Sequence, residues 1–270
     1  MHSQGTALIT GASSGIGAVY ADRLAKRGYD LILVARHEDQ LKAIGSRISG
    51  ETGRSVNVMP ADLTHAADLG RVEQALRTDA GISALVNNAG IAMSGDLAGA
   101  DPERLETLIR LNVLAPTRLA AAAIPGFVAR GTGTLINISS AVALMPERIN
   151  GVYSGTKAYL LNLTSKLRLE VAGKGIRVQV VLPGAIRTAI WEKAGTNIAT
   201  LPPEIFMDAD AMVDAALVGL DNGELVTIPS LPDLADWEAY EAARRNLFPK
   251  LSRSSPAPRY DKGAAFAPSA

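Results

Sequence analysis

Short apolar strands alternate with helical segments over the first 182 residues, and this alternation constrains the fold more than any other feature. Apolar runs predict buried strands at residues 6–10, 30–35, 56–60 and 84–86, before Ser139, and from Ile176 to Leu182. Strands that alternate with helices are typical of a parallel, doubly wound α/β sheet. We therefore expect a single α/β domain over residues 1–251. Residues 252–270, rich in Pro, Ser and Ala, are expected to form a poorly ordered tail or to lie against a neighbour.

Composition excludes several classes of function. The 270 residues suffice for one large domain, and the formal net charge of zero argues against nucleic acid as a partner. Cysteine is absent, and His2, His37 and His65 have no second ligand at metal spacing, so no metal site is expected. No apolar run approaches the roughly 20 residues of a membrane span. The N-terminus leads into a strand without a signal-peptide pattern, which predicts a cytoplasmic protein with no membrane partner.

A glycine-rich turn follows the first strand and opens a helix. Its sequence is GASSGIG, with glycines at Gly11, Gly15 and Gly17. In this strand-turn-helix context, backbone N–H groups and the positive end of the helix can face a pyrophosphate. The spacing differs from G-x-G-x-x-G but meets the same need for close backbone approach. The turn therefore indicates a dinucleotide site.

The second strand ends at Ala35 and is followed by Arg36. An acidic residue in this place of a nicotinamide site would bind the ribose hydroxyls, whereas an arginine can pair with a 2′-phosphate. The sequence therefore favours NADP(H) over NAD(H). The alternative is that Arg36 is only a solvated loop charge.

Residues 150–173 are predicted to form a long helix with a lysine on its apolar face. A stripe at 100° per residue contains Tyr153, Lys157, Leu160 and Thr164. Burying an ammonium costs roughly several kcal/mol of lost hydration unless an anion, a hydroxyl or a ligand pairs with it. Taken singly, the tyrosine can be a core ring and the lysine can extend its charge to solvent. Together they form a proton-transfer pair, because the ammonium favours the tyrosinate.

Polar residues follow the predicted strands at the edge where open α/β sheets bind ligands. Ser139 and Ser140 end one strand, and a serine hydroxyl there can hold a carbonyl oxygen, although a helix cap or turn is the simpler use. Asp62 follows another strand and suits either an adenine edge or a helix cap. Asn112 interrupts an apolar helical run, so its amide should have buried partners or an ordered water, and a purely structural amide is equally possible.

The ordered set of these motifs resembles the short-chain dehydrogenase/reductase family. The resemblance rests on TGASSGIG at 10–17, NNAG at 87–90, Asn112, Ser140, YSGTK at 153–157 and PGAIRT at 183–188, and covers residues 5–190. It implies a Rossmann sheet of about seven strands. It also implies Ser140, Tyr153, Lys157 and Asn112 as catalytic residues. Ser140 is preferred to Ser139 because its interval of thirteen residues to Tyr153 matches the family.

The resemblance also implies a set of cofactor contacts, to which the sequence adds Arg36. They are Gly11, Ser13, Ser14, Gly15, Ile16, Gly17, Asp62, Leu63, Asn88, Gly90, Tyr153, Lys157, Pro183, Gly184, Ile186 and Thr188. The C-terminal sequence GELVTIPSLPDLADW differs from the short D-G-G closure of ketoacyl-carrier-protein reductases. This difference argues against an acyl-carrier substrate and against the common tetramer of those enzymes.

The predicted function is hydride transfer between NADP(H) and a small-molecule ketone, aldehyde or secondary alcohol, in a homo-oligomer. A reductase of 3-oxoacyl thioesters is the alternative enzyme, and an NADPH-sensing protein without turnover is the alternative of another class. Residues 185–206 are interpreted as a lid. Met93, Leu144, Met145 and Trp191 are the expected substrate contacts, in an apolar pocket.

Overall fold

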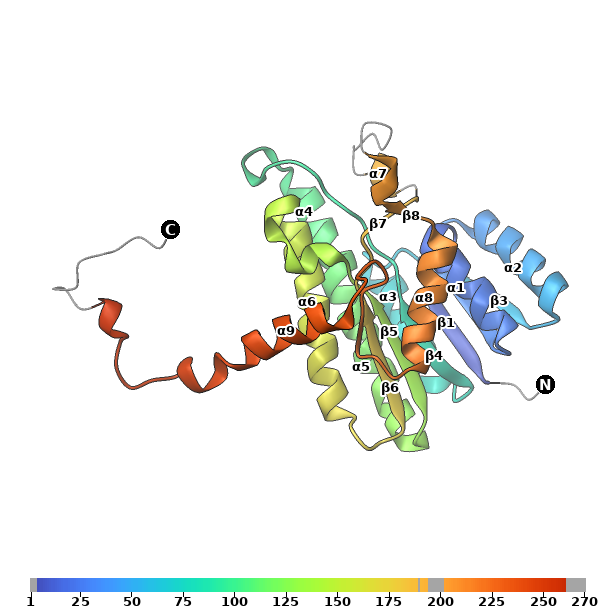
Figure 1. Ribbon diagram of the computed structural model, residues 1–270. Helices are drawn as coiled ribbons and strands as arrows, with labels where there is room; N and C mark the ends of the chain where they lie inside the picture. Colours follow the sequence, from blue (N-terminus) through green and yellow to red (C-terminus); the bar gives the residue numbers. More distant parts are fainter. Residues whose placement is uncertain (1–3, 189, 194–201, 261–270) are drawn as a thin grey trace. The chain divides into compact units, whose positions relative to one another are not determined.

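A computed structural model describes residues 4–188, 190–193 and 202–260 of the chain. Its centre is a seven-stranded, all-parallel sheet with the order β3-β2-β1-β4-β5-β6-β9 (Figure 1). The strands are β1 (Thr6–Thr10), β2 (Asp30–Ala35), β3 (Val56–Pro60), β4 (Ile82–Asn87), β5 (Gly133–Ile138), β6 (Ile176–Val181) and β9 (Val226–Thr227). The predicted doubly wound sheet and its seven strands are confirmed. Every internal strand is buried on both faces, which explains why the strands read as continuous apolar runs.

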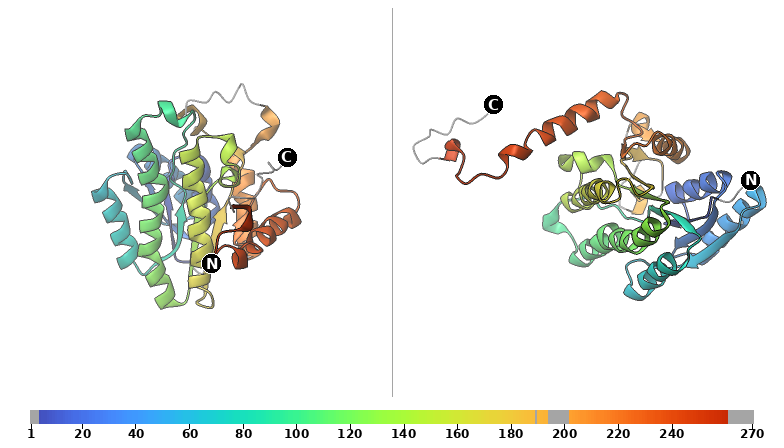
Figure 2. Two further views of the ribbon diagram at one scale, coloured as in Figure 1. Left: turned by 90° about the vertical axis from the view of Figure 1, so that its left-hand side faces the viewer. Right: turned by 90° about the horizontal axis from the view of Figure 1, so that it is seen from below.

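Helices cover both faces of the sheet (Figure 2). One face packs against α1 (Gly15–Lys26), α2 (Glu38–Thr52) and α8 (Ala209–Asp221). The other face packs against α3 (Ala66–Thr78), α5 (Ala115–Arg130) and α6 (Gly151–Glu170). The helix predicted over residues 150–173 therefore exists and is slightly shorter than expected. Two apolar cores, one on each face, follow from this arrangement.

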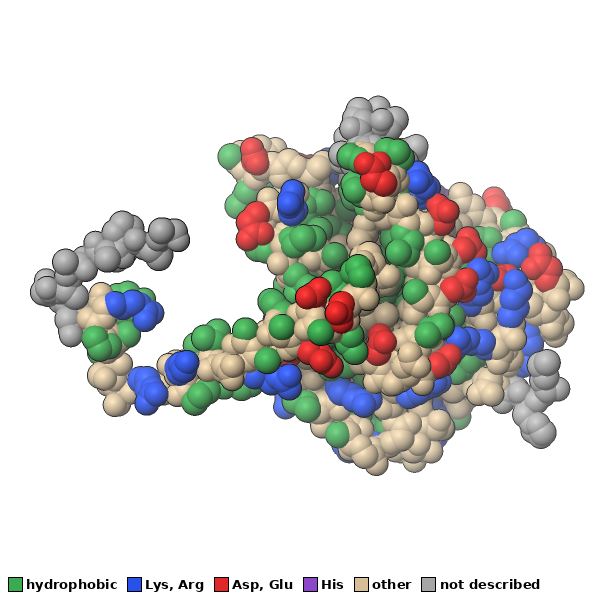
Figure 3. Space-filling model, viewed as in Figure 1, with side chains coloured by type: hydrophobic (Ala, Val, Ile, Leu, Met, Phe, Trp, Pro, Cys, Tyr) green, Lys and Arg blue, Asp and Glu red, His purple; other side chains and the backbone are tan. Residues whose placement is uncertain are grey.

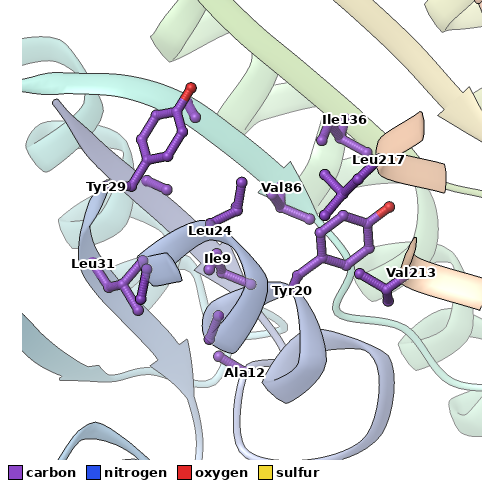
Figure 4. Close-up of a cluster of buried hydrophobic side chains, with 14 of the residues drawn as sticks. Ile9, Ala12, Tyr20, Leu24, Tyr29, Leu31, Val86, Ile136, Val213 and Leu217 are labelled. Atoms are coloured by element: carbon purple, nitrogen blue, oxygen red, sulfur yellow. The ribbon is translucent and has the colours of Figure 1, made fainter. Parts of the chain in front are cut away.

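The core between the sheet, α1 and α8 contains a buried tyrosine without a partner. Tyr20 lies among Ile9, Val213 and Leu217 in the close-up view (Figure 4). Its side chain is fully buried, and its hydroxyl has no hydrogen-bond partner in the described part of the chain. Burial raises the pKa of Tyr20 because the tyrosinate would lose its hydration. The phenol therefore stays neutral, and its unpaired hydroxyl lowers the stability of this core.

The chain forms one continuous helical run from Pro102 to Arg130, with a wide turn inside it. α4 (Pro102–Ile109) leads into a π-helical turn, η2 (Arg110–Leu114), and then into α5. By length and hydropathy alone this run could cross a membrane. Its apolar residues, such as Leu119 and Phe127, are instead part of the core against the sheet and α3. The run is thus accounted for as the core helix of an α/β fold.

The segment after β6 begins and ends with a second, small sheet. β7 (Ala185–Ile186) pairs in parallel with β8 (Phe206–Met207). Between them α7 (Ile190–Lys193) and η6 (Pro203–Ile205) are described, whereas residues 189 and 194–201 of the predicted lid lie outside the described residues. The two ends of the predicted lid are therefore joined by main-chain pairing.

The chain divides into two compact units, Met1–Ser230 and Leu231–Ala270. The boundary falls earlier than residue 251, where the sequence-based division ends the domain. The first unit contains the complete seven-stranded sheet. The second contains α9 (Leu234–Arg245), η7 (Phe248–Lys250) and η8 (Pro258–Tyr260), and none of the described residues of these elements is buried. Among the described residues, only those of the first unit therefore form a hydrophobic core.

Candidate active site

The predicted site lies where β1, β4 and β5 end. These parallel strands end at Thr10, Asn87 and Ile138, so the loops that follow them reach the same edge of the sheet. The strand order reverses between β1 and β4, and open α/β sheets bind ligands at such a switch point. The fold therefore brings the glycine-rich turn, the NNAG loop and Ser139–Ser140 to one edge.

Asn150 fixes the beginning of α6. Its side-chain oxygen accepts hydrogen bonds from the backbone N–H groups of Val152 (3.0 Å) and Tyr153 (3.2 Å). Its amide nitrogen donates to the carbonyl of Gly95 (2.8 Å), in the loop after β4. An asparagine at this position satisfies N–H groups that have no partner inside the helix. One buried side chain therefore caps the helix and ties it to the loop after β4.

Tyr153 is buried in the first turn of α6. Its ring packs with Met93 and Leu108, and 7% of the residue is exposed. Burial raises the pKa of Tyr153 to about 12, and a hydrogen bond with the Ser140 side chain acts in the opposite direction. The nearby Lys157 ammonium would be expected to lower this pKa. In the chain without its cofactor, the loss of hydration around the phenol is the larger contribution, so the pKa rises. The phenol is therefore protonated at neutral pH and can act as an acid.

Lys157 lies one turn further along α6, on the same face. Its ammonium donates to the carbonyl of Ile138 (3.1 Å) and lies 5.8 Å from the centroid of the Tyr153 ring. Burial lowers the pKa of Lys157 to about 8, because the charged form loses its hydration. An ammonium has three N–H donors. Ile138 is its acceptor in the described part of the chain, so two donors remain for a ligand or water.

The two serines at the end of β5 have different partners. Ser139 is buried, and its hydroxyl donates to the main-chain carbonyl of Lys157 (2.7 Å), which fastens α6 to the sheet. Ser140 is half-buried; its hydroxyl makes a long contact with the carbonyl of Pro183 (3.4 Å) and hydrogen-bonds with Tyr153. The geometry supports the choice of Ser140 for the substrate oxygen, and this role stays a prediction.

Asn112 lies in the π-helical turn between α4 and α5, and both polar atoms of its side chain have partners in the protein. Its oxygen accepts from the backbone N–H of Ile91 (3.0 Å), and its nitrogen donates to the Ile91 carbonyl (2.9 Å) and to the Thr156 hydroxyl (3.2 Å). The expectation of buried partners is met. A water at this residue can bind the second lone pair of the side-chain oxygen or the main chain of the wide turn, a geometry that often occurs at functional sites.

The glycine-rich turn allows the close backbone approach that the sequence predicted. A Cβ atom at Gly17 would lie 2.3 Å from the carbonyl oxygen of Gly11 and 2.5 Å from the Asn88 amide. Gly11 itself has φ of +66°, which only glycine adopts without strain. The Asn88 amide donates to the carbonyls of Thr10 (2.9 Å) and Gly11 (3.2 Å). Asn88 therefore holds the turn in place. Ser13 is half-buried, Ser14 exposed and Ile16 half-buried in the same turn.

Two further glycines mark where separate loops meet. A Cβ atom at Gly15 would lie 3.1 Å from the Thr188 methyl group, so the segment after β6 reaches the glycine-rich turn. A Cβ atom at Gly90 would lie 3.5 Å from the Lys157 ammonium nitrogen. Of the other predicted contacts in this segment, Pro183 and Ile186 are buried and Gly184 is exposed. The predicted cofactor residues on four separate segments are thus brought together.

At the other end of the site, Arg36 approaches Asp62. The guanidinium and the carboxylate are 3.9 Å apart, and 60% of the Arg36 side chain is exposed. The Asp62 carboxylate also accepts from the N–H (2.9 Å) and the hydroxyl (2.7 Å) of Thr64, so it does cap a turn. These hydrogen bonds and Arg36 outweigh partial burial and lower the pKa of Asp62. The Leu63 side chain is buried in the core, so the contact predicted for Leu63 with the cofactor would be made by its main chain.

Comparison with known proteins agrees with this geometry. Residues 5–199 match the family described as short chain dehydrogenase. A short-chain dehydrogenase from Sphingobium yanoikuyae, solved in complex with NADPH, is 50% identical, with a TM-score of 0.92 over 95% of this chain and 100% of that one. The bulky-bulky ketone specific alcohol dehydrogenase from Comamonas testosteroni is 43% identical, with a TM-score of 0.89 over 96% of this chain and 99% of that one.

A curated relative is more distant. Human 17-beta-hydroxysteroid dehydrogenase type 3 is 32% identical over 74% of this chain, and the match spans 65% of that protein. The family match alone covers well over half of the chain.

The chain belongs to the short-chain dehydrogenase family. It is therefore an oxidoreductase, and the resemblance found in the sequence is confirmed.

The predicted substrate residues occupy different environments in this short-chain dehydrogenase. Met93 is buried against Tyr153, Leu144 is half-buried and Met145 is 40% exposed. The Trp191 indole donates to the Ile186 carbonyl (2.8 Å) and meets the Phe206 ring edge-on at 5.7 Å. Trp191 is thus fixed to β7 and β8. Met93 is brought to Tyr153, and the substrate roles of all four residues stay predictions.

Sequence reasoning missed two residues that hold α6, the helix of Tyr153 and Lys157, in place. Asn150 caps α6, and the Thr156 hydroxyl accepts from Asn112 while it donates to the Tyr153 carbonyl (2.7 Å). An asparagine just before a predicted helix is a recognisable cap signal. The contacts of Asn150 with Gly95 and of Thr156 with Asn112 join distant segments, and no local pattern indicates them.

Proposed function

We propose that this protein is an NADP(H)-dependent carbonyl reductase and alcohol dehydrogenase that acts on bulky, apolar ketones and the matching secondary alcohols. One observation carries the proposal. A protonated, buried phenol shares one helix face with a buried ammonium that keeps two free donors, at the edge where the glycine-rich turn lies. Mere binding of a dinucleotide does not require such an acid, so this arrangement argues against a sensor without turnover.

The residues of the site fit a nicotinamide dinucleotide phosphate. The close turn at Gly11, Gly15 and Gly17 suits the pyrophosphate, and Thr188 beside Gly15 suits the nicotinamide side. Arg36 is exposed and carries a charge that Asp62 meets only at 3.9 Å, so its guanidinium can pair with a 2′-phosphate. The solved relative from Sphingobium yanoikuyae binds NADPH, which supports the same preference here.

Proton transfer is the part of the chemistry that the chain itself performs. When bound, the cofactor supplies or accepts the hydride. Tyr153 donates a proton to the carbonyl oxygen of the substrate, and Ser140 donates a hydrogen bond to the same oxygen, where negative charge develops. Lys157 stabilises the tyrosinate that remains and binds cofactor hydroxyls through its two free donors. Asn112 fixes the wide turn beside Ile91 and Thr156.

The apolar surroundings of Tyr153 support a bulky, uncharged substrate. The phenol lies in a cluster with Met93 and Leu108, with Ile91, Val142 and Ile149 packed against it. The structural relative from Comamonas testosteroni is specific for ketones with two bulky substituents. A substrate carboxylate would need a cation, and Arg187 is already paired with Asp208 (3.2 Å) and with the Pro203 carbonyl (3.1 Å).

Reduction of 3-oxoacyl thioesters is the second candidate. A very-long-chain 3-oxoacyl-CoA reductase from Anas platyrhynchos is 30% identical over 80% of this chain and 70% of its own length. The higher identity to the ketone-specific dehydrogenase favours the first candidate.

A location in the cytoplasm and a homo-oligomeric state also stay predictions.

A substrate panel tests the proposal. The oxidation of NADPH is followed with aryl alkyl ketones, diaryl ketones, small ketones and 3-oxoacyl thioesters, each against a blank without enzyme. We expect the highest kcat/KM with ketones that carry two bulky groups. Preference for the thioester would support the second candidate, and tight NADPH binding without turnover on any carbonyl would contradict both.

A further inference from the structure

The second unit of the chain carries an apolar surface that none of its described residues covers. Six large side chains are exposed along it: Leu234, Tyr240, Leu247, Phe248, Leu251 and Tyr260, between 48% and 71%. Hydrophobic side chains on the surface of this unit are visible in Figure 3, with Lys and Arg side chains in its later part. Single exposed apolar residues are ordinary, but a run of them marks an interaction surface. We call residues 231–260 the arm.

The arm is an organised element, because its side chains contact one another. Asp233 caps α9 by accepting from the N–H of Ala235 (2.8 Å). Trp237 stacks on Tyr240 at 5.4 Å between ring centroids. The Arg244 guanidinium lies 5.3 Å from the centre of the Phe248 ring. The alignment with the Sphingobium yanoikuyae structure covers 95% of this chain, which exceeds the 230 of 270 residues in the first unit, so that relative also has part of the arm.

Charge is segregated along the arm. All acidic residues of the arm come first and all basic residues follow: Asp233, Asp236, Glu238 and Glu241, then Arg244, Arg245, Lys250, Arg253 and Arg259. Glu241 and Arg244 pair with each other (2.8 Å) at the point where the sign changes. The small residues Ala242 and Ala243 lie at the same point. The arm therefore has an acidic half and a basic half that meet at a position where two chains can approach closely.

We propose that the arm pairs with the arm of a second copy of this chain, antiparallel and about a two-fold axis near Ala242 and Ala243. In this arrangement the acidic half of each arm faces the basic half of the other, and both sets of aromatic side chains are buried. Two-fold interfaces are self-complementary, and an arm with opposite charges at its two ends meets that condition. The arm is also long enough, because a stable interface uses roughly 20–30 residues from each partner.

The charge pattern argues against an anionic membrane as the occupant of this surface. Helices that bind such membranes carry Lys and Arg along their polar face. Here α9 carries Asp236 and Glu238 among its exposed residues, and its basic residues come at and after its end. A second copy of the chain satisfies both halves of the arm, whereas an anionic surface would repel one of them.

Charge reversal in the full-length protein tests the pairing. One variant carries Asp236→Lys and Glu238→Lys, and another carries Lys250→Glu and Arg253→Glu. Sedimentation equilibrium over a wide protein concentration range measures the association constant. We expect each variant alone to associate at least about tenfold more weakly than the wild type, because like charges then face each other. An equimolar mixture of the two should return to within about threefold of the wild type, because opposite charges face each other again.

Controls separate this interface from other causes. Lys174→Glu changes an exposed charge outside the arm and should leave association unchanged. Circular dichroism checks that both variants keep their helices; if either does not, the wild type in rising salt replaces them and should dissociate as the charges are screened. A mixture that stays dissociated, association that neither variant alters, a wild type that is monomeric throughout, or binding to anionic vesicles that Lys250→Glu with Arg253→Glu abolishes would each overturn the proposal.

Discussion

The two ends of the site are held in different ways. Around α6, the functional side chains are buried and fastened to the main chain: Lys157 to Ile138, Asn112 to Ile91, and the first turn to Asn150. Around Arg36 and Asp62, the side chains are partly exposed and approach each other only at 3.9 Å. Groups that transfer protons need fixed positions and shifted pKa values, whereas a charge that selects a cofactor needs only to reach its phosphate. Substitutions at the α6 end should therefore lower kcat, and those at the Arg36 end should raise the KM for the cofactor.

Lys157→Met should have the largest effect among the positions that support Tyr153. The variant keeps the length of the side chain but loses the ammonium that stabilises tyrosinate, so kcat should fall by about 10²–10⁴-fold, the range of an acid–base contribution. The measurement is steady-state turnover, with the NADPH Kd from fluorescence titration. A kcat within threefold of the wild type, roughly, would show that the ammonium is not part of the proton pathway.

The same variant tests burial of the lysine. Because the pKa of Lys157 is lowered to about 8 in the folded protein, the unfolded chain binds more protons between that value and its ordinary pKa. The free energy of unfolding of the wild type should therefore rise relative to Lys157→Met by about 2 kcal/mol between pH 7 and pH 10. Urea unfolding at both pH values measures the difference. Parallel curves for the two proteins would contradict the burial of a charged lysine.

Asn150 is expected to come next, because it positions Tyr153 without touching the substrate. Asn150→Ala removes the cap and the contact with Gly95, so stability should fall by about 1–2 kcal/mol and kcat should fall more than the substrate KM rises. Asn150→Asp keeps the acceptor at the helix start but cannot donate to Gly95. Its negative charge beside the first turn should raise the pKa of Tyr153 and shift the pH profile of alcohol oxidation upward. An unshifted profile in Asn150→Asp with normal kcat would leave Asn150 a structural cap only.

Arg36→Ala should change cofactor choice and little else. Loss of a charge-assisted contact with the 2′-phosphate costs about 1.5–3 kcal/mol, which corresponds to a rise of about 10–100-fold in the KM for NADPH. The KM for NADH and the value of kcat should stay close to those of the wild type. A change in the KM for both cofactors to the same extent would refute selection by Arg36.

The smallest expected effect is at Tyr20, outside the site. Tyr20→Phe removes a buried hydroxyl that has no partner in the described structure and keeps the ring among Ile9 and Leu217. The variant should be as stable as the wild type or more stable by about 1 kcal/mol, with unchanged kcat. Thermal unfolding measures this. A loss of stability would mean that a buried water bonds the hydroxyl.

Much of the fold follows from local sequence. The strands at residues 6–10, 30–35 and 56–60 have the predicted bounds, because each is a short, mostly apolar segment next to a polar or glycine residue such as Gly11, Arg36 or Ser55. The last strand, β9, is only two residues long, since only Val226 and Thr227 pair with β6. The length of a strand at a sheet edge depends on how many residues of the neighbouring strand pair with it, and the sequence of the edge strand alone does not give that number.

Local sequence predicts which side chains share a helix face, but not the electrostatics around them. Tyr153 and Lys157 share a buried helix face, as the 100° periodicity indicates. In the chain alone burial raises the pKa of Tyr153, and the extent of burial depends on residues such as Met93 and Leu108 that pack around the ring from other segments. The link from Asn150 to Gly95 spans 55 positions in the sequence, and only the folded chain reveals it.

Turnover of Tyr153→Phe is the most direct test of the central claim, that the phenol of Tyr153 protonates the substrate. The variant keeps the ring in its cluster with Met93 and removes one oxygen. NADPH binding should be retained, and the first-order rate of ketone reduction under saturating NADPH should fall by about 10²–10⁴-fold. Near-normal turnover with intact NADPH binding would contradict the account.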